Sequence, residues 1–420
     1  MELLRVRLAA SGWRVASATT NLVFQYSVAM ALSFSDAPNC LPATAATAAT
    51  ALPTAAVAAA EALMPQLLAV AASTDVEGGF PTREFAWLGE AGLLTAVLPA
   101  AEGGAGLGKP TALGLLLEVL RHVGRGNLAV GRLFEGHVNA LLLIAELGSP
   151  AQQLRYATDA RAGHLFGVWN TEDPAHGVQL EARAGGDFAL KGAKTFASGA
   201  GHLTRPLLTA ALPDGGGWQM LVLPADSQSP ALDRSFWRPL GMRATASFRA
   251  DLTGLEIGAD DLIGGPNSYY RQPQFGGGAV RFAAVQLGGA EAVYDETRRF
   301  LRALGRTDDP YQRQRLGQMA LLLETGRHWL RGAAAHAVQP DKSAASAETV
   351  VAYANLTRTA IEQIGLEMLR LAERCVGARG LLQPEPFERM HRDLTHYLRQ
   401  PAPDAVLADV GRFVLDGGGF

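Results

Sequence analysis

The chain has 420 residues, with 37 Lys and Arg against 40 Asp and Glu, and its formal net charge is −3. At roughly 150 residues per domain, this length predicts two or three domains and excludes a small disulfide-stapled scaffold. A chain without a basic excess lacks the charge that drives binding to phosphate backbones, so nucleic acid is not an expected partner. Only 18% of the residues are charged and 48% are hydrophobic, which indicates large buried surfaces, subunit interfaces among them.

The two cysteines, Cys40 and Cys375, lie in unrelated contexts and form no C-x-x-C pattern. They indicate neither a structural zinc site nor a disulfide framework. The close histidine pair His391 and His396 has no metal-binding motif around it, so no metal site is expected. A reducing, cytoplasmic compartment fits this cysteine usage best.

Residues 1–54 are expected to be an extension followed by a low-complexity linker. The apolar run at 21–34 is too short to cross a bilayer, so no membrane span is expected. The basic residues ahead of it leave a signal peptide open. The other interpretations are a poorly ordered extension, or a start codon that is placed too far upstream, with Met30 as the working start. Residues 43–60 are nearly all Ala, Thr and Pro, which predicts a linker into the first helix.

The remaining chain changes its hydrophobic period twice. Helical spacing at 55–147 indicates an all-helical region, and short alternating runs such as 188–190 and 219–223 indicate strands. Long helical patterns return at 280–303, 311–339, 344–376 and 384–397, and four such helices predict a bundle. The expected fold class is α+β, mainly α. Its parts are an N-terminal helical domain (55–165), a central antiparallel β-barrel domain (166–275) and a C-terminal four-helix bundle (276–420).

Familiar nucleotide motifs are missing: the sequence has no P-loop, and no G-x-G-x-x-G follows a strand. Rossmann, kinase and metalloenzyme functions are therefore not expected. Three short segments remain, and their order along the chain is informative. They read WNTEDP (169–174), KGAKTFASG (191–199) and LGMRATAS (240–247).

Together these segments resemble the acyl-CoA dehydrogenase family, over roughly residues 55–415. The resemblance implies a helical domain, a β domain and a four-helix bundle that enclose FAD. It places Trp169, Thr171, Phe196 and Ser198 beside the flavin, which needs a flat apolar neighbour and hydrogen-bonding groups at its edge. The alternatives are that Trp169 and Phe196 are ordinary core residues and that Ser198 is an ordinary strand hydroxyl.

A second resemblance concerns the far side of the cofactor. CVGARG (375–380) is similar to the Gly-rich turn that faces the FAD of a partner subunit, which implies roles for Gly377 and Gly380. Their alternative role is to end a helix. The family's R-x-x-F-G segment, which grips the partner's FAD, is absent, and Arg302 is the nearby candidate. The resemblance implies a homodimer or homotetramer.

The sequence departs from the family where the catalytic base is expected. One usual glutamate position holds Pro401, and the other holds the apolar pair Ala279 and Val280 ahead of Arg281. Proline cannot accept a proton, so Asp404 is the candidate base. Val178 also replaces a hydroxyl residue that usually meets the CoA moiety, which makes CoA binding less secure than flavin binding.

The leading hypothesis is an FAD-dependent oxidoreductase of fatty acid metabolism. It would carry out α,β-dehydrogenation of a CoA- or carrier-bound acyl thioester, with hydride transfer to FAD and an electron acceptor left open. The run RDLTHYLRQP (392–401) also resembles the flavin-dependent monooxygenases of the same fold, in which His396, Tyr397 and Gln400 would steer oxygen chemistry. A third hypothesis is a non-catalytic protein that binds flavin or an acyl thioester.

Overall fold

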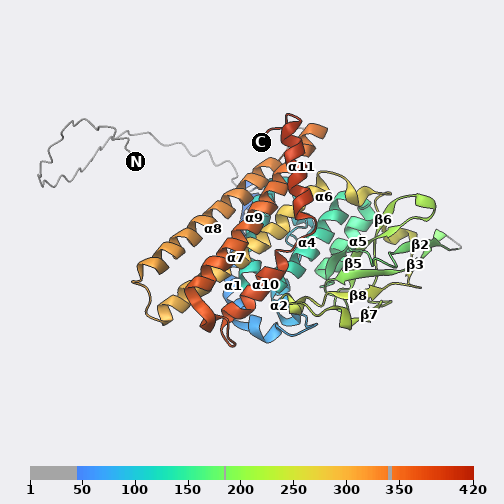
Figure 1. Ribbon diagram of the computed structural model, residues 1–420. Helices are drawn as coiled ribbons and strands as arrows, with labels where there is room; N and C mark the ends of the chain where they lie inside the picture. Colours follow the sequence, from blue (N-terminus) through green and yellow to red (C-terminus); the bar gives the residue numbers. More distant parts are fainter. Residues whose placement is uncertain (1–44, 184–185, 339–342) are drawn as a thin grey trace, which may run out of the picture. The chain divides into compact units, whose positions relative to one another are not determined.

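The computed structural model describes residues 45–183, 186–338 and 343–420, and the statements below concern these residues (Figure 1). Cys40 and residues 1–44 of the expected extension over 1–54 lie outside them. Helices come first, strands follow, and helices return. The first helices are α1 (Ala45–Thr74), α2 (Thr82–Glu90), α3 (Leu113–Gly126), α4 (Leu128–Leu147) and α5 (Pro150–Arg161). The later ones are α6 (Gln274–Gly277), α7 (Ala279–Ala303), α8 (Pro310–Ala337), α9 (Ala344–Gly380), α10 (Pro386–Tyr397) and α11 (Pro403–Leu415).

The four long C-terminal helices expected from the sequence are confirmed as α7 to α10. Helix α7 packs against α3, α8, α9 and α10, and so lies at the centre of the helical layer. Helix α11 was not expected, and it packs against α9. Helix α1 begins at Ala45, inside the stretch expected to be a linker. The linker interpretation does not hold there, because alanine has the highest helix propensity and Ala56 and Ala60 are buried in the core.

The strands gather at one side of the helices (Figure 1). They are β1 (Phe166–Trp169), β2 (Gln179–Ala182), β3 (Phe188–Lys191), β4 (Ala193–Ala197), β5 (Arg205–Ala211), β6 (Trp218–Val222), β7 (Ala231–Asp233), β8 (Phe248–Asp251), β9 (Glu256–Ile257) and β10 (Leu262–Ile263).

These strands form two open sheets, in place of the expected antiparallel barrel. One sheet has the order β10-β6-β5-β2-β3-β9 with β1 on β5, and the other has the order β4-β8-β7. Strands β1 and β5 pair in parallel, with Phe166 opposite Arg205. Strand β1 is also packed on α4, and a sheet that is covered by a helix needs no closure to bury its apolar face.

In the described part of the chain, two helical stretches are long and apolar enough to cross a membrane, Ala51–Thr74 in α1 and the whole of α4. The α4 stretch is 72% buried in the protein, and the α1 stretch is 28% buried. Helix α4 packs between β1, α3 and α7. Its apolar composition is therefore accounted for by its place in the core.

Helices α3 and α7 cross at very short range, and Gly288 is the residue of α7 that permits this. A Cβ atom built on Gly288 would lie 2.1 Å from the Arg121 carbonyl oxygen and 2.7 Å from the Arg125 nitrogen. Both are backbone atoms, which cannot rotate away as a side chain can. The close crossing fixes α7 on α3 and thereby positions the residues at the start of α7.

His137 of α4 connects the helical layer to the sheet. Its Nε2 lies 2.7 Å from the Leu94 carbonyl oxygen, and its Nδ1 lies 3.1 Å from the Phe166 backbone nitrogen. The N–H of Phe166 must donate to an unprotonated Nδ1, so the neutral ring with its proton on Nε2 satisfies both partners. Burial lowers the pKa of His137 to about 4.

We therefore expect acid to destabilise the protein through His137. Because the folded state resists protonation of His137, the unfolded state binds one more proton once the pH falls below the unfolded pKa of about 6.5. Stability is therefore lost as the pH falls from about 6.5 to about 4. Between pH 7.5 and pH 5 the expected loss is about 2 kcal/mol, at 1.36 kcal/mol per pKa unit. Urea unfolding of the wild type and of His137→Gln at both pH values measures it. A pH dependence equally steep in the variant would assign the acid sensitivity to another group.

Candidate flavin site

The first and second sequence segments meet at the end of β1. Trp169 is 1% exposed, and its indole Nε1 donates to the Ser198 carbonyl oxygen at 2.9 Å. The backbone N–H of Thr195 donates to the Thr171 carbonyl oxygen at 2.9 Å. The structure thus brings Trp169, Thr171 and the 195–198 stretch together, with the Thr171 side chain exposed.

An ion pair between a fully buried lysine and a partly buried glutamate holds these two segments in register. Lys194 is fully buried, and its ammonium Nζ pairs with the Glu172 carboxylate and lies 3.2 Å from the Thr209 hydroxyl. Burial lowers the pKa of Lys194, and the nearby Glu172 opposes this shift. Removing one partner of such a pair leaves the other charge unpaired, so the pair fixes the path of the chain just before Phe196.

Phe196 has two unusual properties. Its φ is +50°, in the left-handed region that L-residues other than glycine rarely adopt, and its side chain is 51% exposed although it is a large apolar group. Its ring meets the rings of Phe236 and Trp237 edge-on, with centroids 5.2 and 6.2 Å away. The strained backbone therefore holds an aromatic face open to the outside, next to other aromatic rings.

A chain of hydroxyl groups ends at Ser198. The Thr245 hydroxyl donates to the Met242 carbonyl oxygen at 2.9 Å, and its Oγ1 lies 2.8 Å from the Ser247 Oγ. The Ser247 Oγ in turn lies 2.9 Å from the Ser198 Oγ. Because Thr245 already uses its proton, Ser247 donates to Thr245 and Ser198 donates to Ser247. The lone pairs of Ser198 are left to accept a hydrogen bond from an N–H group.

Helix α10 completes this region. The Met242 backbone N–H donates to the buried Asp393 carboxylate at 2.6 Å, which ties α10 to the third sequence segment. The His396 ring meets the Trp237 ring edge-on at 5.5 Å, and burial lowers the pKa of His396. We call Phe196, Phe236, Trp237 and His396 the aromatic cluster.

The other predicted site residues lie elsewhere. Arg302 is exposed near the end of α7, and at 1.5 Å per residue it is about 30 Å along this helix from Arg281. Gly377 interrupts α9 with φ 59° and ψ −166°, and Gly380 is the last residue of α9. Within one chain, the structure does not bring these three residues to the aromatic cluster.

Asp404 lies in the first turn of α11, and its side chain is exposed. Among the described contacts, no hydrogen bond or ion pair joins it to Trp169, Phe196 or Ser198. The assignment of Asp404 as a catalytic base therefore stays a prediction without support from the local geometry.

Sequence reasoning missed a second group of polar residues behind this region. Arg132, Glu135 and Asn139 share one face of the largely apolar α4, and Arg281 of α7 donates through its Nε to the Asn139 side-chain oxygen. The signal in the sequence was their spacing of three and four residues, which places them on one helix face. Trp237 was also missed, because it belongs to none of the three segments.

The aromatic cluster and Ser198 fit a flavin ring. An isoalloxazine is flat and largely apolar, and the exposed face of Phe196 offers a surface on which such a ring can stack. The ring carries an N–H at N3, and another at N5 when it is reduced, and Ser198 can accept from an N–H group. The residues present thus supply the flat neighbour and the hydrogen-bonding edge that flavins require.

Comparisons with known proteins agree with this geometry. Residues 54–164 match the pattern of "Acyl-CoA dehydrogenase, N-terminal domain", and residues 280–398 match that of "Acyl-CoA dehydrogenase, C-terminal domain". A dibenzothiophene monooxygenase from Rhodococcus erythropolis is 28% identical, over 85% of this chain and 92% of the relative. The putative acyl-CoA dehydrogenase YdbM from Bacillus subtilis is 26% identical, over 80% of this chain and 89% of the relative.

Among solved structures, FMN-bound TdsC from Paenibacillus sp. A11-2 superposes with a TM-score of 0.77 at 20% identity, over 86% of this chain and 97% of the other. At this identity the likeness concerns the fold. The two domain matches together cover more than half of the chain, and they enclose the strands that carry Trp169 and Phe196. The chain therefore belongs to the acyl-CoA dehydrogenase family.

Proposed function

We propose that this protein is a flavin-dependent monooxygenase, which uses reduced flavin and molecular oxygen to oxygenate a small organic substrate. The observation that carries the proposal is that α10 packs a histidine, His396, against Trp237. Abstraction of the α-proton of an acyl thioester needs a positioned base, and Pro401, Ala279 and Val280 occupy the positions at which the family resemblance leads one to expect it. The similarity to a dibenzothiophene monooxygenase supports the same choice.

When bound, the reduced flavin supplies electrons to oxygen, so that one oxygen atom enters the substrate and the other leaves as water. The chain's own residues hold the ring and keep water out. Phe196 offers its face, Ser198 accepts an N–H, and the buried Trp237 closes the side next to α10. Because burial lowers the pKa of His396, its ring is neutral at neutral pH and can both donate and accept a hydrogen bond.

We propose FMN rather than FAD as the flavin. The R-x-x-F-G segment that the resemblance associates with the FAD of a partner is absent. The nearby candidate Arg302 is exposed and lies near the far end of α7. A flavin without an adenosine half does not need these contacts. The FMN in the Paenibacillus structure supports this choice. A lower dissociation constant for FAD than for FMN would favour the FAD hypothesis.

Dehydrogenation of an acyl thioester is the alternative that has to be tested alongside. The proposal predicts oxygen-dependent product from indole when reduced FMN is supplied, and no anaerobic bleaching of bound flavin by acyl-CoA thioesters. Bleaching by an acyl-CoA would establish dehydrogenation instead. In that case the loss of bleaching in Asp404→Asn would identify the base. Bound flavin with neither activity would leave a non-catalytic flavin-binding protein.

Replacing His396 by alanine is expected to uncouple oxygen use from product formation. Loss of a positioned acid–base group typically costs 10²- to 10⁴-fold, so we expect product per reduced FMN to fall by about 100-fold while hydrogen peroxide accounts for the oxygen consumed. Oxygen electrode traces combined with a peroxide assay measure both quantities. His391→Ala is the matched control, because His391 of the same helix pairs with the exposed Glu373. Equal coupling in His396→Ala and the wild type would remove His396 from the mechanism.

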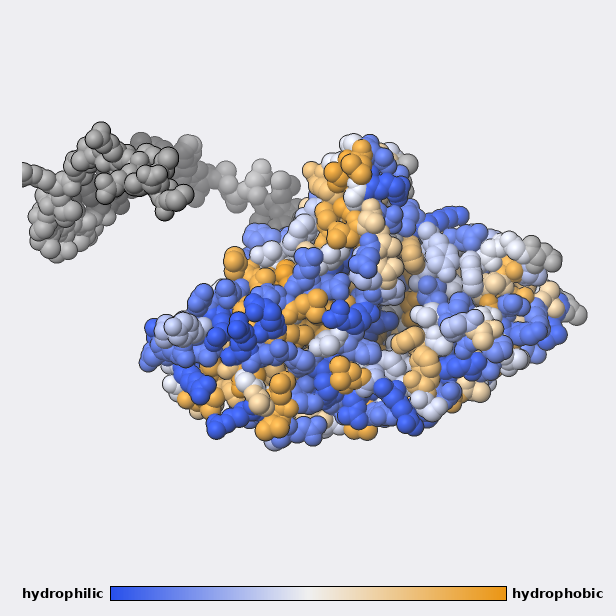
Figure 2. Space-filling model, in the orientation of Figure 1, coloured by the Kyte–Doolittle hydropathy of each residue, from blue (hydrophilic) through white to orange (hydrophobic). Residues whose placement is uncertain are grey.

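We further propose a homodimer or homotetramer in the cytoplasm. Apolar residues gather where α11 lies (Figure 2), and this helix and the residues after it expose Leu407, Val414, Leu415 and Phe420, with Leu415 88% exposed. A contiguous exposed apolar surface is typical of an interface. The free, buried thiol of Cys375 is compatible with a reducing compartment. Light scattering tests the assembly, and a monomer at micromolar concentration would contradict it.

A further inference from the structure

Four polar side chains connect α4 to the start of α7. Arg132 Nη1 donates to Glu135 Oε2 at 2.8 Å, and the Asn139 amide donates to Glu135 Oε1. The Asn139 side-chain oxygen then accepts from Arg281 Nε. Glu135 is buried, and the other three side chains are partly buried. We call these four residues the α4–α7 polar cluster.

The charges of the α4–α7 polar cluster do not balance. It holds two guanidinium groups and one carboxylate, and both oxygens of that carboxylate are already occupied by Arg132 and Asn139. In the described part of the chain, Arg281 forms no ion pair, and its hydrogen-bond partner Asn139 is neutral. Burial lowers the pKa of Arg281, but a guanidinium stays charged in proteins. The cluster therefore carries one positive charge without a counter-charge.

Tyr397 gives a second, independent sign of an unfilled partner position. The residue is 4% exposed, and its hydroxyl oxygen is buried without a hydrogen-bond partner in the described structure. Burial raises the pKa of Tyr397. The nearby Glu135 charge adds to this shift, and the nearby Arg132 charge opposes it. The phenol is thus protonated and able to donate next to the cluster. Buried polar groups in native proteins are normally satisfied, so this hydroxyl indicates a missing acceptor.

Tyr269 and Tyr270 connect the α4–α7 polar cluster to the candidate flavin site. The Tyr270 hydroxyl lies 3.4 Å from the side-chain oxygen of Asn170, which stands between Trp169 and Thr171. The ring centroids of Tyr269 and Tyr270 are 5.0 Å apart. Burial raises the pKa of Tyr269, and the charges of Arg132 and Arg281 are close enough to oppose this shift. On the other side, Tyr397 directly follows His396 in α10.

We propose that the α4–α7 polar cluster is the substrate subsite, and that the substrate carries a carboxylate or an equivalent oxyanion. Arg281 supplies the unpaired charge for this group, and the Tyr397 hydroxyl donates to it. The inference rests on the proposed function only for the position of the flavin. It names a substrate class that differs from the neutral indole bound in a Paenibacillus structure of this fold.

Indole-3-carboxylate and indole are matched probes, because they differ only in the carboxylate. Their binding is measured by calorimetry on the full chain, with and without oxidised FMN and with no reductant present. We expect the carboxylate to bind at least about tenfold more tightly than indole, as one charge-assisted contact provides. Arg281→Gln should reduce this ratio to below about twofold, and Arg281→Lys, which keeps the positive charge but not the planar guanidinium, should retain part of it. Arg298→Gln, farther along α7 and paired with Asp295, should leave it unchanged.

Equal affinities of the wild type for the two probes would overturn the inference, as would an unchanged ratio in Arg281→Gln. If Arg281→Gln does not fold, Tyr397→Phe takes its place. It should weaken the carboxylate several-fold and leave indole unaffected, and unchanged carboxylate binding in it would count against the subsite. Failure of the proposed function can be told apart from failure of this inference. In that case the protein would form no oxygen-dependent product but would still bind indole-3-carboxylate more tightly than indole.

Discussion

Substituting alanine for Gly241 is expected to lower flavin-dependent turnover severely while the helical layer stays folded. A Cβ atom on Gly241 would lie 2.1 Å from the Arg392 carbonyl oxygen and 2.6 Å from the Asp393 nitrogen. These are backbone atoms of α10, so α10 would have to move away from the third sequence segment. The Met242–Asp393 hydrogen bond of 2.6 Å would be lost with that movement.

The effect on activity follows from the position of His396, one turn after Asp393 on α10. Misplacing a functional group by about 1 Å can cost 10²-fold in rate, so we expect at least about a 100-fold loss of turnover with reduced FMN. Gly411→Ala is the control, because a Cβ on this exposed α11 glycine meets nothing within 4 Å. Circular dichroism reports whether the helices persist. Wild-type turnover in Gly241→Ala would show that the contact between α10 and Gly241 does not position the site.

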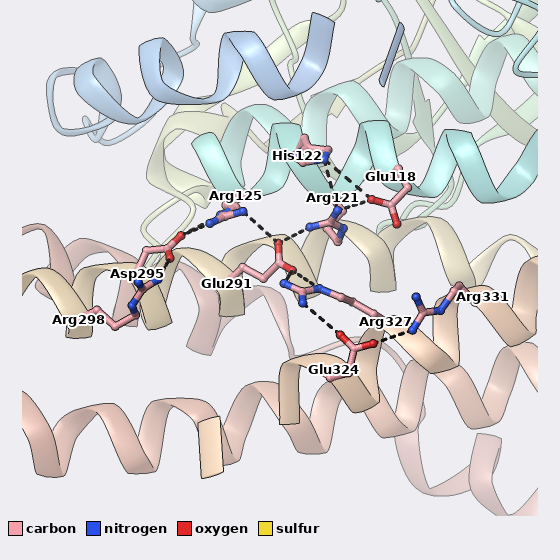
Figure 3. Close-up of polar contacts among 10 residues, drawn as sticks. All are labelled: Glu118, Arg121, His122, Arg125, Glu291, Asp295, Arg298, Glu324, Arg327 and Arg331. Carbon is pink, nitrogen blue, oxygen red and sulfur yellow. Dashed lines mark hydrogen bonds and ion pairs between the residues drawn. The ribbon is translucent and has the colours of Figure 1, made fainter. Parts of the chain in front are cut away.

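The second large effect is expected for Glu291→Gln, at the centre of an ionic network between α3, α7 and α8 (Figure 3). The Glu291 side chain is 1% exposed. One carboxylate oxygen accepts from Arg121 Nη1 at 2.6 Å, and the other accepts from Arg327 Nη2 at 2.7 Å. Glutamine keeps the shape but removes the charge, and breaking a buried pair typically costs about 3–5 kcal/mol.

Glu324→Gln is the matched control for this prediction. Glu324 pairs with Arg327 and Arg331 in the same network (Figure 3), but its side chain is 49% exposed. Solvent screens such a pair, so its unfolding midpoint should stay close to that of the wild type. Urea unfolding followed by circular dichroism measures both variants. Similar midpoints for the two would mean that Glu291 is no more important than a surface pair.

The long helices and the strand region could be predicted because each carries a strong local signal. The period of 3.6 residues marks α7 to α10, and the change to short alternating runs marks the strands. The start of α1 was missed because an Ala-rich stretch lacks an apolar period, and α11 because Gly411 and the glycines after Leu415 weaken its signal. The parallel pairing of β1 with β5 depends on residues almost 40 positions apart, for which a local pattern holds no information.

The candidate site could likewise be predicted from the sequence only in part. Trp169, Thr171, Phe196 and Ser198 could be chosen from the order of short segments, and the structure brings them together through the Trp169–Ser198 and Thr195–Thr171 hydrogen bonds. Trp237 and the α4–α7 polar cluster depend on contacts between distant elements, such as Arg281 with Asn139. The cluster therefore becomes visible only once the chain is folded.

Binding of oxidised FMN to the full-length protein tests the central claim most directly. Quenching of FMN fluorescence should be saturable in the wild type. The affinity for FMN should fall by at least about fivefold in Phe196→Ala, because stacking on an aromatic face contributes about 1 kcal/mol or more. Tyr311→Ala, which removes an exposed ring of α8, should bind FMN as the wild type does. The account would be contradicted if FMN did not bind, or if Phe196→Ala and Tyr311→Ala bound it equally well.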